Sequence, residues 1–369
     1  MDYFVERFCD DPGAVALDQS IMLEGKPAVA GSKILEGFRA PFTAAVLEKL
    51  QAAGVPLAGY ARSDEFGADD LADESDSLSA LIGAVAQKQC RWAIGNDWSG
   101  RLRRQAARNG VCYLHPTYGT VSRYGLVAAV CSMDQIGVAA AAPADCFALL
   151  QKIAGCDPRD GAMYADTEYA FAPHKNPIKI GIPANVLSAA TAAAQKDLRD
   201  FAALFESVEC QLPHFSLLPQ VQYILSAAEF SHNINRYDGI KFGHRAANFR
   251  GLDDLYRGTR TEGFGEPVKL AAMAGAMALS QEYYLTWYDK AMRIRRLLKD
   301  ALDFAQYDVL VLPNAVEGDK YTATALYALA TLAGLPSLSV PFGKTGIQLL
   351  AAPRNENVLL AAAERGMTR

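Results

Sequence analysis

The residues whose types and order most clearly suggest a site for chemistry lie between Trp92 and Gly125, in the run WAIGNDWSGRLRRQAARNGVCYLHPTYGTVSRYG. A short apolar segment leads into a Gly-Asn-Asp turn and then into a basic helical segment. In many α/β enzymes a strand, a sharp turn and a helix in this order hold the nucleophile. Here the position where a nucleophile is expected holds Arg101, whose guanidinium stays protonated and cannot attack a carbonyl.

Other side chains offer alternative chemistry. Ser77, Ser99 and Cys90 are the candidates for a nucleophile that has moved. No histidine has an evident catalytic partner nearby in the sequence, so we expect His115, His174, His214, His232 and His244 to be structural or exposed. The seven cysteines form no C-x-x-C pair, which argues against a zinc or dithiol site. We therefore expect no cofactor and no metal.

Composition excludes several classes of protein. The 369 residues are 51% hydrophobic and 21% charged, as in a folded chain with a large core. The net charge of -5 gives no electrostatic case for DNA binding. A local basic set remains a candidate for RNA or phosphate, or else a solvated helix face: Lys88, Arg91, Arg101, Arg103, Arg104 and Arg108. The N-terminus has no signal-peptide pattern and no apolar run is long enough to span a membrane, so we expect a cytoplasmic protein.

The elements around the turn alternate between apolar strands and helices of ten or more residues, which predicts an α/β sheet covered by helices. Helices are expected over 44–53, 79–87, 187–206 and 283–305, the last with a solvated Arg/Lys face. Strands are expected over 55–61, 177–184 and 307–315, and the prolines of 177–184 favour an edge strand. The acidic run 63–76 is expected to be a solvated loop. No linker is evident, so 1–369 is predicted to be a single domain.

Eight segments together resemble one known family. They are GSKILEGF (31–38), HPTYGTVSRYGLVA (115–128), SMDQIG (132–137), IAGCDPRD (153–160), IKIGIP (178–183), NRYDGIKFGHRA (235–246), RTEGFG (260–265) and LAGLPSLSVPFG (332–343). In this order they resemble the amidase signature family, and within it the A subunits of the glutamine-dependent amidotransferases that act on Glu-tRNA(Gln) or Asp-tRNA(Asn). The resemblance implies a mixed β-sheet with helices on both faces. It also implies an N-terminal helical region, which would be shortened here because only 17 residues precede Asp18.

The resemblance implies a specific reaction. A neutral lysine takes a proton through a bridging serine, which activates a second serine to attack the amide of glutamine. Backbone N–H groups at a glycine-rich turn stabilise the oxyanion. Carried over by position, the lysine is replaced by Asp18, the bridging serine falls on Ser77, and the nucleophile is replaced by Arg101.

Further positions depart from the family's pattern. The nucleophile segment resembles G-S-D-T-G-G-S-I-R, and its oxyanion turn falls on Trp98, Ser99 and Gly100. A substrate-binding arginine in a V-K-R-R-like stretch falls on Leu270 or Ala271. An aspartate suited to the substrate ammonium falls on Thr324.

Two functions follow as hypotheses. The first is a catalytically inactive homologue that acts as a binding or scaffold subunit, with Asp18 and Arg101 forming an ion pair in the old pocket. Its partners would be the amidotransferase B and C subunits, with tRNA contacted only indirectly, and the loop-like segments RYDG, HRA and EGFG would serve interaction away from the chemistry. The alternative is an active amidase or glutaminase subunit with relocated catalytic residues.

Overall fold

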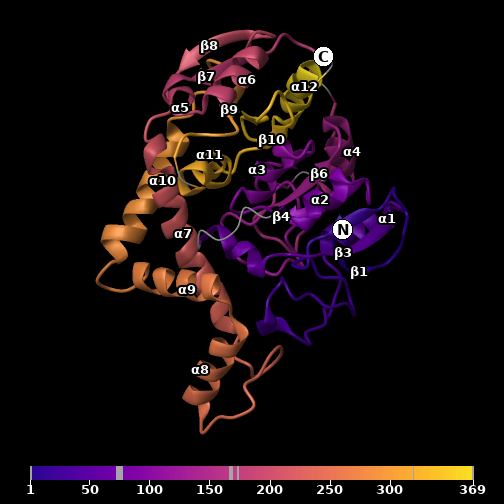
Figure 1. The fold of residues 1–369 in the computed structure, drawn as a ribbon, viewed down its shortest axis with the longest axis vertical. Helices are drawn as coiled ribbons and strands as arrows, with labels where there is room; N and C mark the ends of the chain where they lie inside the picture. Colours follow the sequence, from indigo (N-terminus) through magenta and orange to yellow (C-terminus); the bar gives the residue numbers. More distant parts are fainter. Residues whose placement is uncertain (1, 72–77, 166–168, 173, 319, 368–369) are drawn as a thin grey trace.

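A mixed sheet of 11 strands forms the centre of the molecule (Figure 1). The computed structural model describes residues 2–71, 78–165, 169–172, 174–318 and 320–367. The strands are β1 Phe4–Arg7, β2 Val15–Leu17, β3 Leu57–Ala61, β4 Trp92–Asn96, β5 Cys112–His115, β6 Ile136–Ala140, β7 Lys179–Pro183, β8 Glu206–Cys210, β9 Val309–Pro313, β10 Ser337–Val340 and β11 Ile347–Ala351. Their order across the sheet is β1-β3-β2-β4-β6-β5-β10-β11-β9-β7-β8.

Parallel and antiparallel pairs are mixed along this sheet. Strand β2 is parallel to β3 and β4, and β7 is parallel to β8 and β9, whereas the pairs from β4 through β6, β5, β10 and β11 to β9 are antiparallel. The predicted mixed α/β sheet is therefore confirmed. The edge position predicted for 177–184 is wrong, because β7 pairs with β9 on one side and with β8 on the other.

Helices cover both faces of the sheet. They are α1 Ala45–Ala52, α2 Ala80–Ala86, α3 Arg101–Arg108, α4 Pro143–Ile153, α5 Ala184–Ser188, α6 Ala192–Ala202, α7 Leu218–Asn233, α8 Leu252–Gly263, α9 Glu266–Ala278, α10 Lys290–Asp300, α11 Lys320–Ala333 and α12 Glu356–Met367. Short 3-10 helices are η1 Lys33–Leu35, η2 Glu65–Leu71, η3 Phe215–Leu217 and η4 Ile234–Arg236, and η5 Tyr284–Asp289 is a π-helix.

Several predicted elements are confirmed, and three are corrected. The helix expected over 187–206 is two helices, because the Thr191 side chain caps a new one by accepting from the Ala194 N–H. The helix expected over 283–305 begins as the π-helix η5 and its α-helical part ends at Asp300. The acidic run is not all loop, since 65–71 form η2 and Phe66 is buried; residues 72–77 lie outside the described part of the chain.

The core follows the alternation of side chains along the strands. On β9, Val309 and Val311 join the cluster beneath α1, α4, α6 and α12, whereas Leu310 and Leu312 face the cluster beneath α7, α9 and α11. A third cluster packs α2 and α3 on the strands near the N-terminus. Strand β4 thus ends between packed layers, at the place where α3 begins. Among the described helices, none is long and apolar enough to cross a membrane.

Candidate functional site

The turn between β4 and α3 is held by a carboxylate. Asp97 accepts from the Leu102 N–H at 2.9 Å and from the Arg103 Nε at 2.6 Å, and both Asp97 and Arg103 are buried. Gly100 adopts a φ of 87°, and a Cβ placed there would lie 2.2 Å from the Cβ of Tyr327. The turn therefore needs both the carboxylate and the glycine to keep its shape.

Arg103 ties this turn to α11. Its Nη1 donates to the Tyr327 carbonyl at 3.1 Å and its Nη2 to the Thr331 Oγ1 at 2.7 Å, while its Nε binds Asp97. A buried guanidinium is tolerated only when its charge and its N–H groups are satisfied, and these bonds do so. The strand, the turn and α11 form one rigid frame around Arg103.

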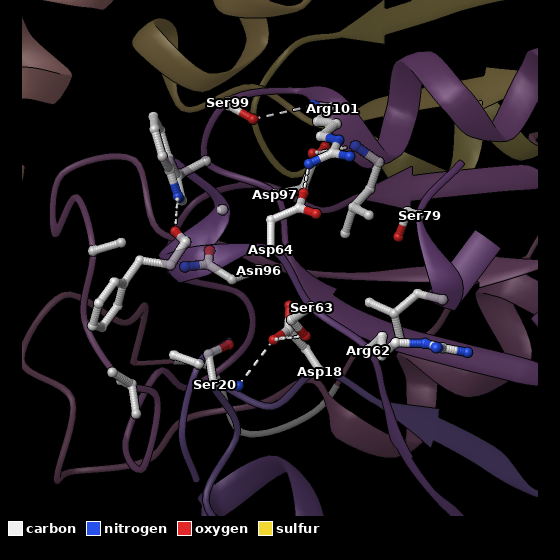
Figure 2. A pocket seen from close by; sticks show the side chains of 18 residues that line it. Asp18, Ser20, Arg62, Ser63, Asp64, Ser79, Asn96, Asp97, Ser99 and Arg101 are labelled. Carbon is white, nitrogen blue, oxygen red and sulfur yellow. Dashed lines mark hydrogen bonds and ion pairs between the residues drawn. The ribbon is translucent and has the colours of Figure 1, made fainter. Parts of the chain in front are cut away.

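Arg101 occupies a different position, facing the pocket beside the turn. Its guanidinium forms an ion pair with the Asp64 carboxylate, and Figure 2 shows the two side chains together above Ser63 and Asp18. The Arg101 side chain is buried, whereas 28% of the Asp64 side chain is exposed. Burial, with a further contribution from Arg104, lowers the pKa of Arg101 to about 10, so the guanidinium still carries its charge at neutral pH.

Asp18 lies at the end of β2, in the same pocket but with other partners. Its Oδ1 accepts from the Ser20 N–H at 2.9 Å and from the Ser63 Oγ at 3.1 Å. Loss of solvation raises the pKa of this carboxyl, and the hydrogen bonds offset only part of that rise. The predicted Asp18–Arg101 ion pair is wrong. Both residues line one pocket, as expected, but the carboxylate that pairs with Arg101 is Asp64.

The pocket itself is small. Trp98 is fully buried in its wall, with its Nε1 donating to the Phe66 carbonyl at 3.2 Å. The remaining cavity measures about 40 Å³, whereas pockets for small ligands run from roughly 300 Å³ upwards. A tryptophan and a buried arginine side chain therefore take up space that a substrate would need.

The remaining positions carried over from the family lie elsewhere or outside the described residues. Ser77 lies outside them. Leu270 and Ala271 lie on α9 and do not line the pocket: the Leu270 side chain is exposed, and Ala271 is buried in the core beneath α7, α9 and α11. Thr324 belongs to α11, and its side chain is not among those described. Ser99 and Trp98 do line the pocket.

Serine and cysteine candidates for a relocated nucleophile have ordinary structural roles. The Ser99 Oγ accepts from the Arg101 N–H at 3.3 Å, and its carbonyl accepts from the Gln222 side chain. Burial raises the pKa of the Cys90 thiol to about 12, so the reactive thiolate is scarce. No sequence pattern pointed to Ser63, which is the hydroxyl that contacts a carboxylate in the pocket.

The segments RYDG, HRA and EGFG lie close to this site, not away from it. The His244 N–H donates to the Ile34 carbonyl at 2.9 Å, which docks the 235–246 segment on 31–38. Glu65 accepts from the Ser32 Oγ and, at 2.9 Å, from the Gly265 N–H. Because Glu65 follows Asp64 in the chain, Gly265 of EGFG holds the loop that carries the partner of Arg101 directly, and His244 of HRA docks on the 31–38 segment that also binds this loop.

The basic set proposed for RNA or phosphate is not a surface patch. Arg101, Arg103 and Arg104 are buried, and Arg91 pairs with Asp145 at 2.7 Å. Buried guanidiniums cannot neutralise the backbone of a nucleic acid. For Arg101, Arg103 and Arg104, both the binding hypothesis and the alternative of a solvated helix face are therefore wrong.

Comparisons with known proteins agree with this fold. A family model described as Amidase matches residues 83–360. The chain is 34% identical to the glutamyl-tRNA(Gln) amidotransferase A subunit of Lachnoclostridium phytofermentans, over 97% of this chain and 84% of the relative. It is 36% identical to that of Halorhodospira halophila, over 91% of this chain and 79% of the relative.

Solved structures also share this fold. The glutamyl-tRNA(Gln) amidotransferase A subunit from Thermotoga maritima matches with a TM-score of 0.75 and 24% identity, over 98% of this chain and 86% of that one. An inhibitor-bound structure from work on a vestigial protein complex and the origins of an s-triazine catabolic enzyme matches with a TM-score of 0.79 and 22% identity, over 96% and 83%. These two likenesses establish a shared fold.

Proposed function

The chain belongs to the amidase family, and we propose that it is a binding or scaffold member of it that does not hydrolyse amides. The observation that carries this proposal is the ion pair between Arg101 and Asp64. By the resemblance of the segment 95–103, Arg101 falls at the position at which the family pattern has its nucleophilic serine. A protonated guanidinium provides neither a nucleophile nor a base.

The surroundings of Arg101 support the same function. Acyl transfer requires an activated nucleophile, a base within hydrogen-bond reach and donors aimed at the developing oxyanion. Asp18, the residue that the resemblance matches to the family's lysine, lines this pocket, and its Oδ1 already accepts two hydrogen bonds. A cavity of about 40 Å³ has room for a water molecule or two but not for glutamine.

One observation favours a second function, an active amidase with a relocated nucleophile. The Ser63 Oγ lies 3.1 Å from Asp18 Oδ1, and loss of solvation raises the pKa of that carboxyl, which makes it a better base than an ordinary aspartate. Catalysis through Ser63 would require Trp98 or Arg101 to move, because the cavity is too small for an amide substrate. We therefore place it second.

The partners proposed are amidotransferase B and C subunits, or proteins like them. The support is that the relatives at 34–36% identity are themselves named as A subunits. In this proposal residues 1–369 form a single cytoplasmic domain. It binds its partner subunits directly and contacts tRNA only through them.

Ammonia release and co-purification test the proposal together. The purified chain is incubated with glutamine, alone and with B and C subunits, and the Thermotoga maritima A subunit serves as the positive control. We expect no ammonia above the buffer rate and stable co-purification with the B and C subunits. Ammonia release that disappears in Ser63→Ala would instead establish the second function, and failure to co-purify would refute the scaffold role.

A further inference from the structure

A second cavity lies apart from the pocket of Arg101 and shares none of its lining residues. It measures about 420 Å³, within the usual range for small-molecule sites. It lies between α10, the end of α11 and the segment that follows β5. Its lining residues are Tyr118, Ser132, Tyr164, Met292, Arg295, Arg296, Lys299, Leu332, Ala333, Gly334 and Pro353.

The wall of this cavity is cationic. Arg295, Arg296 and Lys299 line it from adjacent turns of α10, and no acidic side chain is among the described residues that line it. Arg296 pairs with Asp300 at 2.7 Å, but both side chains are exposed, so an anionic ligand can compete for the guanidinium. Lys299 makes no ion pair with any residue in the described part of the chain. Two of the three cations are therefore available to a ligand.

Arg295 is the fixed member of this set. Its Nε donates to the Leu332 carbonyl at 2.7 Å, and its Nη1 and Nη2 donate to the Ser132 Oγ and carbonyl at 2.8 and 3.1 Å. Ser132 is held in turn by Glu229, which accepts from its N–H at 2.8 Å. This arrangement fixes the positive charge of Arg295 in the cavity lining, within reach of the Glu229 carboxylate, and joins α10 to Ser132 and to Leu332 of α11.

The rest of the lining combines aromatic and apolar side chains. The Tyr118 hydroxyl donates to the Cys131 carbonyl at 2.9 Å and accepts from the Arg123 Nη1 at 2.6 Å, so its ring is held in place. The guanidinium of Arg354 lies 4.9 Å from the centre of the Tyr164 ring. Flat rings beside cations suit a ligand that has both a planar group and a negative charge.

We propose that this cavity binds a small organic phosphate that carries a planar ring, of the nucleoside monophosphate class. The phosphate, which carries a charge of about −2 at neutral pH, lies against Arg296 and Lys299 and is attracted electrostatically by Arg295. The ring packs on the wall formed by Tyr118, Tyr164 and Pro353. This site goes beyond the scaffold function proposed above and does not depend on it.

Calorimetric titration of the full chain with adenosine monophosphate, at constant ionic strength, tests the site. We expect saturable binding with one ligand per chain. Lys299→Gln should weaken it about tenfold, whereas Lys290→Gln, an equally exposed lysine on the same helix outside the cavity, should leave it unchanged. Tyr164→Leu should reduce the preference for adenosine monophosphate over inorganic phosphate.

Three results would overturn the proposal. One is the absence of saturable binding. Another is an equal loss in Lys299→Gln and Lys290→Gln, which is the behaviour of a diffuse basic surface that attracts any polyanion. The third is inorganic phosphate binding as tightly as adenosine monophosphate, which would leave the aromatic wall without a role. Both lysine variants are surface changes, and the melting temperature of each is measured as the control that its fold is intact.

Discussion

The frame of the turn after β4 and the pocket beside it differ in how closely they follow the family pattern. In the frame, Asp97, Gly100 and Arg103 match the pattern of the nucleophile segment, and the structure gives each an exacting structural role. In the pocket, Asp18 and Arg101 depart from the pattern, and each has a partner other than the one expected. The backbone shape of a catalytic turn and its chemistry therefore depend on separate side chains, so the chemistry can be lost while the shape stays.

The frame should be the more sensitive region, and Arg103→Met tests this most strongly. The substitution removes the buried guanidinium that pairs with the buried Asp97 carboxylate at 2.6 Å, and breaking a buried pair from one side costs about 3–5 kcal/mol of unfolding free energy. Chemical denaturation measures the loss. Arg293→Met, which removes an exposed pair with Asp289, is the control and should cost less than about 1 kcal/mol. Equal losses in both variants would mean that the frame is not a special region.

Gly100 has a positive φ and also lies close to Tyr327, and Gly100→Ala, compared with a control, separates the energetic weight of these two features. The added methyl would lie 2.2 Å from the Tyr327 Cβ in a backbone with a φ of 87°, and we expect a loss of about 2–3 kcal/mol. Gly110→Ala is the matched control, because Gly110 has a φ of 72° but no atom within 4 Å of the added carbon. It should cost about 1 kcal/mol. If the two variants lose the same amount, the close approach to α11 has no energetic weight.

We expect the Arg101–Asp64 ion pair of the pocket to contribute less to the free energy of unfolding than the contacts of Arg103 in the frame. Arg101→Met removes a buried cation, but Asp64 is partly exposed and can regain water, so we expect a loss of about 1–2 kcal/mol. A double-mutant cycle with Asp64→Asn measures the coupling, and the double variant should be less destabilised than the sum of the two single ones. Strict additivity would contradict the pairing of Arg101 with Asp64.

Asp18→Asn should have the smallest effect, and with the opposite sign. Loss of solvation raises the pKa of Asp18, so its ionised form opposes folding at neutral pH, and this cost disappears as the pH falls through the raised pKa. The variant should therefore be more stable than the parent at pH 7, and this difference should shrink and disappear as the pH falls through the raised pKa. Melting temperatures across this range measure it. A destabilised variant at pH 7 would mean that Asp18 has a cationic partner after all.

Much of this architecture could be predicted from the sequence. The strand-turn-helix around Trp92–Gly125, the mixed sheet and the presence of Asp18 and Arg101 in one pocket followed from local patterns and from the order of the eight segments. These features either depend on local contacts or were implied by the resemblance to the family. The prediction of one helix over 187–206 was wrong for a local reason that was visible, namely a threonine cap in the middle of an apolar pattern.

The partner of Arg101 could not be predicted, for a physical reason. The run 63–76 offers many carboxylates, and its composition is that of a solvated loop. Asp64 faces the pocket, and Glu65, the next residue, is held by Ser32 and Gly265 from distant parts of the chain, which no local pattern predicts. Likewise, helical periodicity does not say which face of α9 turns inward, so the outward position of Leu270 was not evident.

The most direct test of the proposed loss of catalysis is whether this pocket contains an activated nucleophile. The intact chain is treated with a fluorophosphonate, which forms a covalent bond with activated serines, and its mass is then measured. The Thermotoga maritima A subunit serves again for the positive control. We expect no mass increase for this chain under conditions that fully label the control. A stoichiometric adduct that disappears in Ser63→Ala would contradict this expectation and would show that the amidase chemistry has moved within the pocket.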